Sequence, residues 1–100
     1  MGKIVHIVLW KLRKQAGEDG FAQAKAAIAN LKTVPGPETF HLGPPLLDGR
    51  AKGFNWGLYS VFASPEALQT YAVSEAHVNV VEKHVKPNVE ELLAYDFELE

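Results

Sequence analysis

Four histidines and one tyrosine are the residues of this sequence best suited to moving protons. The histidines are His6, His41, His77 and His84. Imidazole titrates near neutral pH, so a histidine beside an apolar stretch needs a chemical or structural reason to be there. His6 interrupts one face of an apolar strand pattern. Burying an imidazole without a partner costs about 1–3 kcal/mol, so we expect His6 to be hydrogen-bonded or to line a solvated cavity.

Tyr71 and His77 form the most useful pair of these residues. They lie on two sides of an expected helix break, so their side chains can converge despite an irregular spacing. A histidine can remove a proton from an acidic carbon, and a phenol can donate to the oxyanion that then develops. The alternative is that Tyr71 is a helix core residue and that His77 only caps a helix.

Other kinds of site are disfavoured by the spacing of their residues. His77 and His84 are two helical turns apart, and no acidic residue supplies the usual i, i+4 metal partner. The serines lack the glycine pattern of a nucleophile elbow, and there is no phosphate-binding glycine loop. The sequence has no cysteine, which excludes thiolate nucleophiles and disulfides. We therefore expect neither a metal nor another cofactor.

The first half of the chain predicts a strand, a helix and a weaker strand. In residues 3–12, His6, Val8 and Trp10 share one face while Val5, Ile7 and Leu9 share the other, so this strand is apolar on both sides. A turn at residues 17–20 precedes an amphipathic helix with a single apolar stripe. The helix ends before the VPGP motif of residues 34–37, and ETFHLG is the next strand. The stripe consists of Phe21, Ala24, Ile28 and Leu31.

The second half predicts another two-sided strand, a broken helix and a last strand. Residues 44–53 form an irregular loop, and the strand FNWGLYSVF follows at 54–62. Ser64 and Pro65 begin a helix that runs through Tyr71, kinks near residue 73 and restarts at Ser74. The restarted helix has an apolar stripe of Val78, Val81 and Val85. The last strand has Leu93, Tyr95, Phe97 and Leu99 on one face.

The element order β-α-β-β-α-β predicts a ferredoxin-like α+β fold, in one domain over residues 1–100, with both helices on one face of an antiparallel sheet. The other face is apolar as well. Leaving it uncovered would expose more apolar surface than is usual for a monomer, so we expect a homodimer that packs sheet to sheet.

Composition narrows the partners and the compartment. The net charge is −2 and the basic residues are scattered, which argues against nucleic acid. The 47% hydrophobic content suits a packed core, while no apolar run reaches the length of a membrane span. The absence of cysteine is compatible with a reducing compartment, so we expect a cytoplasmic protein without membrane contact.

Four segments carry a family resemblance, and together they span nearly the whole chain: VHIVLWKL, VPGP, GFNWGLYSVFASPEALQTYAVSEAH and DFELE. In these segments the sequence resembles the stress-responsive dimeric A/B barrel (Dabb) family. The resemblance implies a ferredoxin-like protomer that pairs with a second copy into a dimeric α+β barrel.

One branch of that family is similar to olivetolic acid cyclase, a cofactor-free enzyme that closes a polyketide by aldol condensation. Carried over to this sequence, His77 would be the general base and Tyr71 would orient the substrate. His6 matches a further cavity histidine, while Trp56 stands where those cyclases have another histidine, so the pocket must differ in shape and polarity. The substrate-binding residues expected here are His6, Val8, Trp10, Trp56 and Leu58.

Three functions remain open from the sequence. The first is a cofactor-independent aldol cyclase or lyase that acts on a polyketide-like substrate. The second is a non-enzymatic stress-response homodimer that binds a small apolar molecule. The third is a cofactor-free monooxygenase that deprotonates a phenolic substrate.

Overall fold

The computed structural model describes residues 2–14 and 21–100, so the turn predicted at residues 17–20 lies outside the described residues. The described elements follow the predicted order. They are β1 (Ile4–Leu12), α1 (Ala22–Ile28), η1 (Ala29–Thr33), β2 (Thr39–Gly43), η2 (Asp48–Arg50), β3 (Trp56–Phe62), α2 (Pro65–Val73), α3 (Glu75–Val80), η3 (Val81–Val85), η4 (Lys86–Asn88) and β4 (Val89–Glu98).

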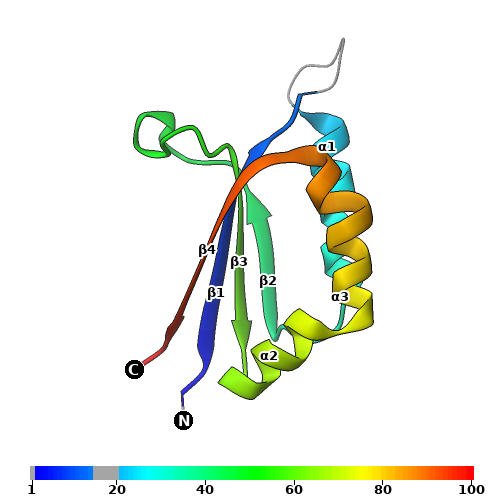
Figure 1. The fold of residues 1–100 in the computed structure, drawn as a ribbon. Helices are drawn as coiled ribbons and strands as arrows, with labels where there is room; N and C mark the ends of the chain where they lie inside the picture. Colours follow the sequence, from blue (N-terminus) through cyan, green and yellow to red (C-terminus); the bar gives the residue numbers. More distant parts are fainter. Residues whose placement is uncertain (1, 15–20) are drawn as a thin grey trace.

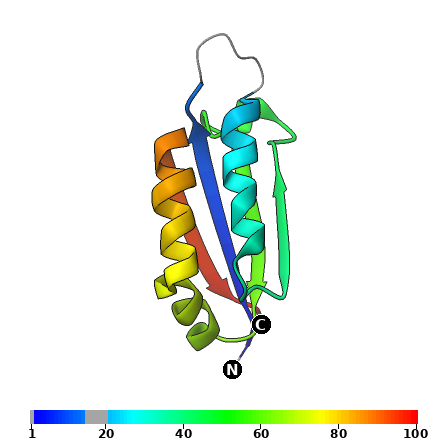
Figure 2. The same cartoon turned by 90° about the vertical axis from the view of Figure 1, so that its right-hand side faces the viewer.

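The strands form one sheet in the order β2-β3-β1-β4, and each neighbouring pair is antiparallel. The helices cover one face of this sheet, as Figure 1 shows along the edge of the sheet and Figure 2 shows from the helix side. This arrangement confirms the predicted ferredoxin-like α+β architecture. No helix among the described residues is long and apolar enough to cross a membrane.

The main core lies between the sheet and α1. Trp10 and Leu12 point from β1 toward Ala24 and Ile28 of α1, and all four side chains are buried. The strand alternation explains the placement, because every second residue of β1 faces the helices. A second buried cluster lies at the other end of the sheet and supports the candidate site. It consists of Ile4, Val34, Phe62 and Tyr71.

The VPGP motif ends the first helical segment, as predicted, and places a glycine against Tyr71. Val34 already has extended backbone angles, which is the conformation that a following proline favours. Gly36 has a φ of 142°, and a Cβ at this position would lie 2.9 Å from Cδ1 of Tyr71. Only glycine therefore fits both the backbone conformation and the close approach to the ring.

Two serines begin the two helical segments after β3. The Ser64 hydroxyl accepts a hydrogen bond from the backbone N–H of Ala67, and Ser74 does the same for His77. Because Ser74 has extended backbone angles, α2 ends at Val73 and α3 starts in a new direction. The predicted cap at Ser64 and the predicted break near residue 73 are both confirmed.

The predicted apolar stripe of the restarted helix was wrong at Val78, whose side chain is 45% exposed. The segment Val81–Val85 is a π-helix, which turns less per residue than an α-helix. Val85 consequently lines up with His77 and Val81, and the inward face rotates away from Val78. Val81 packs against the core as predicted, and Val80 rather than Val78 packs there with it.

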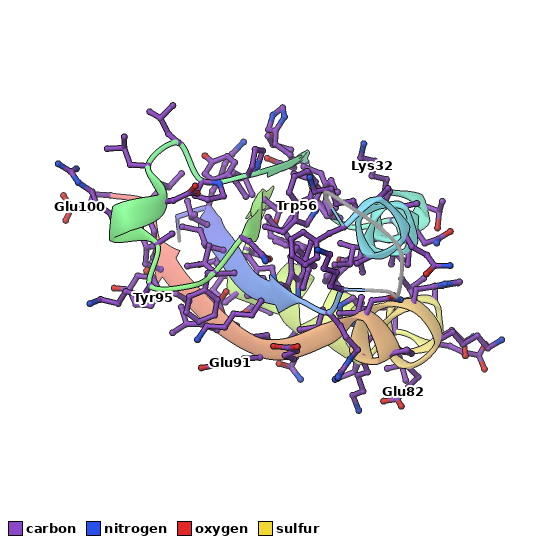
Figure 3. The ribbon with its side chains drawn as sticks, turned by 90° about the horizontal axis from the view of Figure 1, so that it is seen from above. Lys32, Trp56, Glu82, Glu91, Tyr95 and Glu100 are labelled. Atoms are coloured by element: carbon purple, nitrogen blue, oxygen red, sulfur yellow. The ribbon has the colours of Figure 1, made fainter. Side chains whose placement is uncertain are left out.

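The sheet face opposite the helices is apolar and open in the single chain. Large side chains on this face are between 41% and 61% exposed, and they come mostly from β4. Figure 3 shows Tyr95 on this side, away from the helices. The predicted alternation of the last strand is thereby confirmed. The exposed residues are Tyr59, Leu93, Tyr95, Phe97 and Leu99.

Candidate functional site

A cavity of about 220 Å³ lies between the sheet and the helices. Its walls are mostly apolar, and its ionisable side chains are two histidines and one tyrosine. The sheet provides His6, Val8, Trp10, Leu58, Leu92 and Ala94, and the helical side provides Leu31, Tyr71, His77, Val81 and Val85.

Six of the seven predicted site residues line this cavity, and Trp56 does not. Trp56 is the first residue of β3, where it pairs with Trp10 of β1 two residues before Leu58. Its ring packs against the core beside α1. The Nζ atom of Lys25 is 4.8 Å from the centre of that ring. Figure 3 shows Trp56 between the sheet and the helix, and part of it borders a separate hollow beside the 44–55 loop.

His41 and His84 also lie outside the cavity. His41 is exposed on β2, where its ring is stacked near Tyr59 with the ring centres 6.4 Å apart. His84 is in η3, and its backbone carbonyl accepts a hydrogen bond from the Asn88 side chain. Among the described residues there is no group of three or more metal-ligating side chains.

Ser74 connects the two halves of the Tyr71–His77 pair. Its hydroxyl donates to the Tyr71 backbone carbonyl at 2.9 Å and accepts from the His77 backbone N–H at 3.2 Å. Across the break, the rings of Tyr71 and His77 lie with their centres 4.4 Å apart. The convergence predicted from the broken helix is therefore present, and one serine hydroxyl fixes it.

The His77 ring is oriented so that one nitrogen is left for a ligand. Nδ1 lies 3.1 Å from the Ala72 carbonyl oxygen. A carbonyl oxygen can only accept, so Nδ1 carries the proton and Nε2 has its lone pair available when the ring is neutral. Burial lowers the pKa of His77 from its usual 6.5, the hydrogen bond to Ala72 opposes this shift, and the nearby charge of His6 adds to it. His77 is thus a neutral base at neutral pH.

Tyr71 has the opposite character. Its side chain is 3% exposed, and burial raises the pKa of its hydroxyl to about 12. The phenol therefore keeps its proton at neutral pH and can donate it in a hydrogen bond. Phe62 lies against the ring at a centre-to-centre distance of 4.9 Å and, together with Gly36, holds the ring in place.

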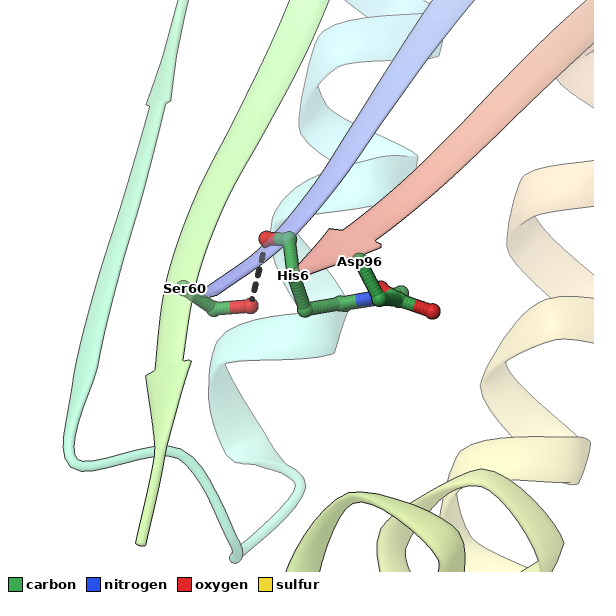
Figure 4. A network of polar contacts seen from close by, with 3 residues as sticks. All are labelled: His6, Ser60 and Asp96. Atoms are coloured by element: carbon green, nitrogen blue, oxygen red, sulfur yellow. Dashed lines mark hydrogen bonds and ion pairs between the residues drawn. The ribbon is translucent and has the colours of Figure 1, made fainter. Parts of the chain in front are cut away.

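His6 has the partner that its position demands. Its Nδ1 contacts the Asp96 carboxylate on β4, the strand paired with β1 (Figure 4). On the other side, the buried Ser60 hydroxyl donates to the His6 backbone carbonyl at 3.0 Å, as Figure 4 also shows. Of the two alternatives expected for His6, the hydrogen-bonded one is present, and the ring also lines the cavity.

Asp96 is the charged residue beside this site that the sequence analysis missed, together with five apolar residues of the cavity wall, Leu31, Val81, Val85, Leu92 and Ala94. The alternation of the last strand indicated only that Asp96 leaves the apolar face. The pairing of His6 with Asp96 depends on the register between β1 and β4. One signal could have found it: His6 and Asp96 each alternate onto the helix-facing side of their strands, and an imidazole and a carboxylate can form a hydrogen bond.

The sequence profile of the stress-responsive A/B barrel domain matches residues 4–99. The chain belongs to the stress-responsive A/B barrel (Dabb) family. Comparison with curated protein sequences gives no significant match.

Solved structures similar to this Dabb chain have the same fold at low identity. A Dabb family protein from Mesorhizobium loti, with a ferredoxin-like fold, has a TM-score of 0.82 and 21% identity, covering 100% of this chain and 99% of that one. A dimeric ferredoxin-like protein of unknown function from Jannaschia has a TM-score of 0.74 and 22% identity, covering 98% and 100%. The hydroxynitrile lyase of Passiflora edulis has a TM-score of 0.79 and 20% identity, covering 99% and 94%.

Proposed function

We propose that this Dabb protein is a cofactor-independent enzyme that moves a proton on a small carbonyl compound and thereby makes or breaks a carbon–carbon bond. The observation that carries the proposal is the Tyr71–His77 pair in one apolar cavity. Burial lowers the pKa of His77 and raises that of Tyr71, so a neutral base and a neutral hydrogen-bond donor stand side by side.

The chemistry follows from the two available atoms. In the condensation direction, Nε2 of His77 takes the proton from a carbon next to a carbonyl group. The electron pair of that C–H bond forms the carbon–carbon double bond of an enolate while the carbonyl π electrons move onto the oxygen. The Tyr71 hydroxyl donates a hydrogen bond to this developing oxyanion. The enolate carbon then forms a bond to a second carbonyl carbon. In the lyase direction the same steps run backwards.

The size of the cavity favours a small substrate. About 220 Å³ is below the range of roughly 300–1,000 Å³ that is usual for ligand sites. An aromatic or short aliphatic carbonyl compound fits this space better than an extended chain. Cyclisation of a polyketide-like substrate therefore stays a prediction of the sequence, and our proposal is the broader reaction class.

A lyase is known on the same fold. The Passiflora edulis neighbour is described as a hydroxynitrile lyase, and it covers nearly the whole chain. At 20% identity this likeness concerns the fold, so it supports the proposal only as an analogy.

Deuterium exchange tests the proton-transfer step directly. We expect the protein to speed the exchange of the central carbon protons of acetylacetone in heavy water, followed by proton NMR. His77→Gln should slow the catalysed exchange by about 10²–10⁴-fold. Tyr71→Phe should slow it by about 10²-fold, because the enolate loses one donor.

His84→Gln is the matched control, because His84 is a histidine of the adjoining helical segment that does not line the cavity. It should keep the wild-type rate. A wild-type protein that does not exceed the buffer rate, or a His77→Gln variant that matches the wild type, would contradict the proposal.

A second candidate is a non-enzymatic protein that holds an apolar molecule in the same cavity, favoured by its mostly apolar walls. Tight binding of benzaldehyde or a similar ligand without exchange of acetylacetone would support this alternative. Oxygen consumption with phenolic compounds would instead support the monooxygenase hypothesis.

We also propose that the protein is a homodimer. Structural neighbours are described as dimeric, and the open apolar face on β1, β3 and β4 is the surface that a second sheet would cover.

A further inference from the structure

A second imidazole faces the reaction space from the wall opposite His77. His6 projects from β1 and His77 from α3, and both line the same cavity. The nearby charge of His6 contributes to lowering the pKa of His77, which agrees with their closeness. The rings of His6, Phe62, Tyr71 and His77 form a continuous row, with successive ring centres 6.0, 4.9 and 4.4 Å apart.

Asp96 connects His6 to the outside of the protein. The carboxylate contacts Nδ1 of His6 and also borders a separate open hollow of about 300 Å³ beside α2. The side chain of His6 is 15% exposed and that of Asp96 is 44% exposed. The pair therefore reaches from the cavity to the solvent beside α2.

We propose that His6, positioned by Asp96, is the second acid–base group of this site and exchanges its proton with solvent through the Asp96 side. The inference rests on the proposed function, since it assigns the group that works on the second carbonyl oxygen. Asp96 is a positioning residue, because it contacts His6 and does not line the cavity itself.

The geometry of the pair determines which atom acts. An ionised carboxylate can only accept a hydrogen bond, so Nδ1 of His6 carries the proton that it donates to Asp96. Nε2 is then the nitrogen of His6 that remains for a substrate. A carboxylate that orients an imidazole in this way fixes its tautomer and stabilises the imidazolium form. Nε2 of His6 can then exchange a proton with a substrate, while His77 has a backbone carbonyl as the partner of its Nδ1.

The reaction balances with these two groups. When the enolate carbon attacks the second carbonyl, the π electrons of that carbonyl move to its oxygen, which takes the proton from Nε2 of His6. The result is a hydroxyl group, neutral His6 and protonated His77. His77 releases its proton, His6 gains one from solvent, and the starting states return. In the lyase direction His6 removes the hydroxyl proton while the carbon–carbon bond breaks.

Cleavage of the aldol adduct of benzaldehyde and acetone, followed by benzaldehyde absorbance, tests this role. It requires both groups, whereas exchange of acetylacetone requires only the His77 side. We expect His6→Gln and Asp96→Asn to lower cleavage about 10²-fold. We expect each to lower exchange much less, so that the ratio of the two rates falls. The double variant should lose no more cleavage activity than His6→Gln alone, because the two residues act as a unit.

The pH profile of cleavage separates the part played by His77 from that of His6. The ionisable groups that face the two imidazoles are Tyr71 from α2 and Asp96 from β4. In the cleavage direction His6 takes the hydroxyl proton and protonated His77 returns a proton to the enolate carbon, so the wild-type cleavage rate should fall as the pH rises past the lowered pKa of His77. This fall should remain in His6→Gln, which loses cleavage activity but keeps His77, and it should be absent in His77→Gln.

Glu98→Gln is the matched control, since Glu98 follows Asp96 on the same side of β4 and pairs with the backbone N–H of Gly2. It should leave both rates unchanged. Circular dichroism melting of each variant identifies a loss that comes from unfolding, and Asp96→Glu should then recover part of the cleavage rate.

Equal cleavage-to-exchange ratios in the wild type and in folded His6→Gln would overturn this inference and leave the proposed function standing. Absence of both reactions in the wild type would overturn the proposed function and this role with it.

Discussion

Burial gives Tyr71 and His77 their different chemical characters. Both face an apolar cavity that disfavours charge, so the imidazole stays unprotonated and the phenol stays protonated. The backbone carbonyl of Ala72 further fixes which imidazole nitrogen is available. A base and a donor therefore arise at neutral pH mainly from burial.

The lowered pKa of His77 makes a prediction for stability. Below its usual pKa of 6.5, the unfolded state binds a proton that the folded state resists. The free energy of unfolding should therefore decrease as the pH falls below this value, and the decrease should end below the folded-state pKa. The His77→Gln variant lacks this component, so its stability should depend less on pH over the same range.

Urea unfolding at one fixed protein concentration, from neutral pH down to about pH 5, measures this difference. An NMR titration of the His77 ring supplies the folded-state value. A ring that titrates at or above 6.5 would contradict the assigned role of burial.

At the scale of elements, a helix break creates the site. An uninterrupted helix from Pro65 would place Tyr71 and His77 on different faces, because six residues are far from a whole number of turns. Ser74 ends one segment and caps the next, and its hydroxyl bonds to both residues of the pair. The π-helix that follows turns His77 and Val85 toward the same interior.

Ser74→Ala and Ser64→Ala form a matched pair of variants that test this role. Each removes one N-terminal cap, so each should lower the free energy of unfolding by about 0.5–2 kcal/mol. Only Ser74→Ala also releases the backbone between Tyr71 and His77. We therefore expect acetylacetone exchange to fall several-fold in Ser74→Ala and to stay at the wild-type level in Ser64→Ala. Equal exchange rates in the two folded variants would show that the cap does not position the pair.

At the scale of the whole molecule, the helices cover one face of the sheet and leave the other face apolar. Tyr95, Phe97 and Leu93 stand on that open face, and β4 contributes most of it. Burying such a surface against a second sheet removes apolar area from water, which is the main favourable term in association. The dimer that we propose therefore follows from the same alternation that builds the inner cavity.

Two charges on this face should separate the protomers. We expect the double variant Tyr95→Lys and Phe97→Lys to sediment as a monomer at micromolar concentration, where the wild type sediments as a dimer. Val78→Lys is the control, because Val78 is similarly exposed but lies on α3, on the helix side. A monomeric wild type, or a double variant that remains dimeric, would refute this use of the face.

The sequence by itself determined the elements, their order and the two-sided character of the strands. The signals were local, as with the alternation around His6 in β1, the proline after Val34 and the serine caps at Ser64 and Ser74. Such features depend on the backbone preferences of a few neighbouring residues, so a pattern of residues is enough to identify them.

Only the tertiary structure decided which residues share the cavity. The register of β4 against β1 placed Asp96 beside His6. The packing of α1 against the sheet placed Trp56 in the core, while Leu58 lines the cavity. Val78, in α3 just before the π-helix, likewise faces outward. Each outcome depends on contacts between segments far apart in the chain, and the packing of the whole fold selects among registers that the local pattern leaves equivalent.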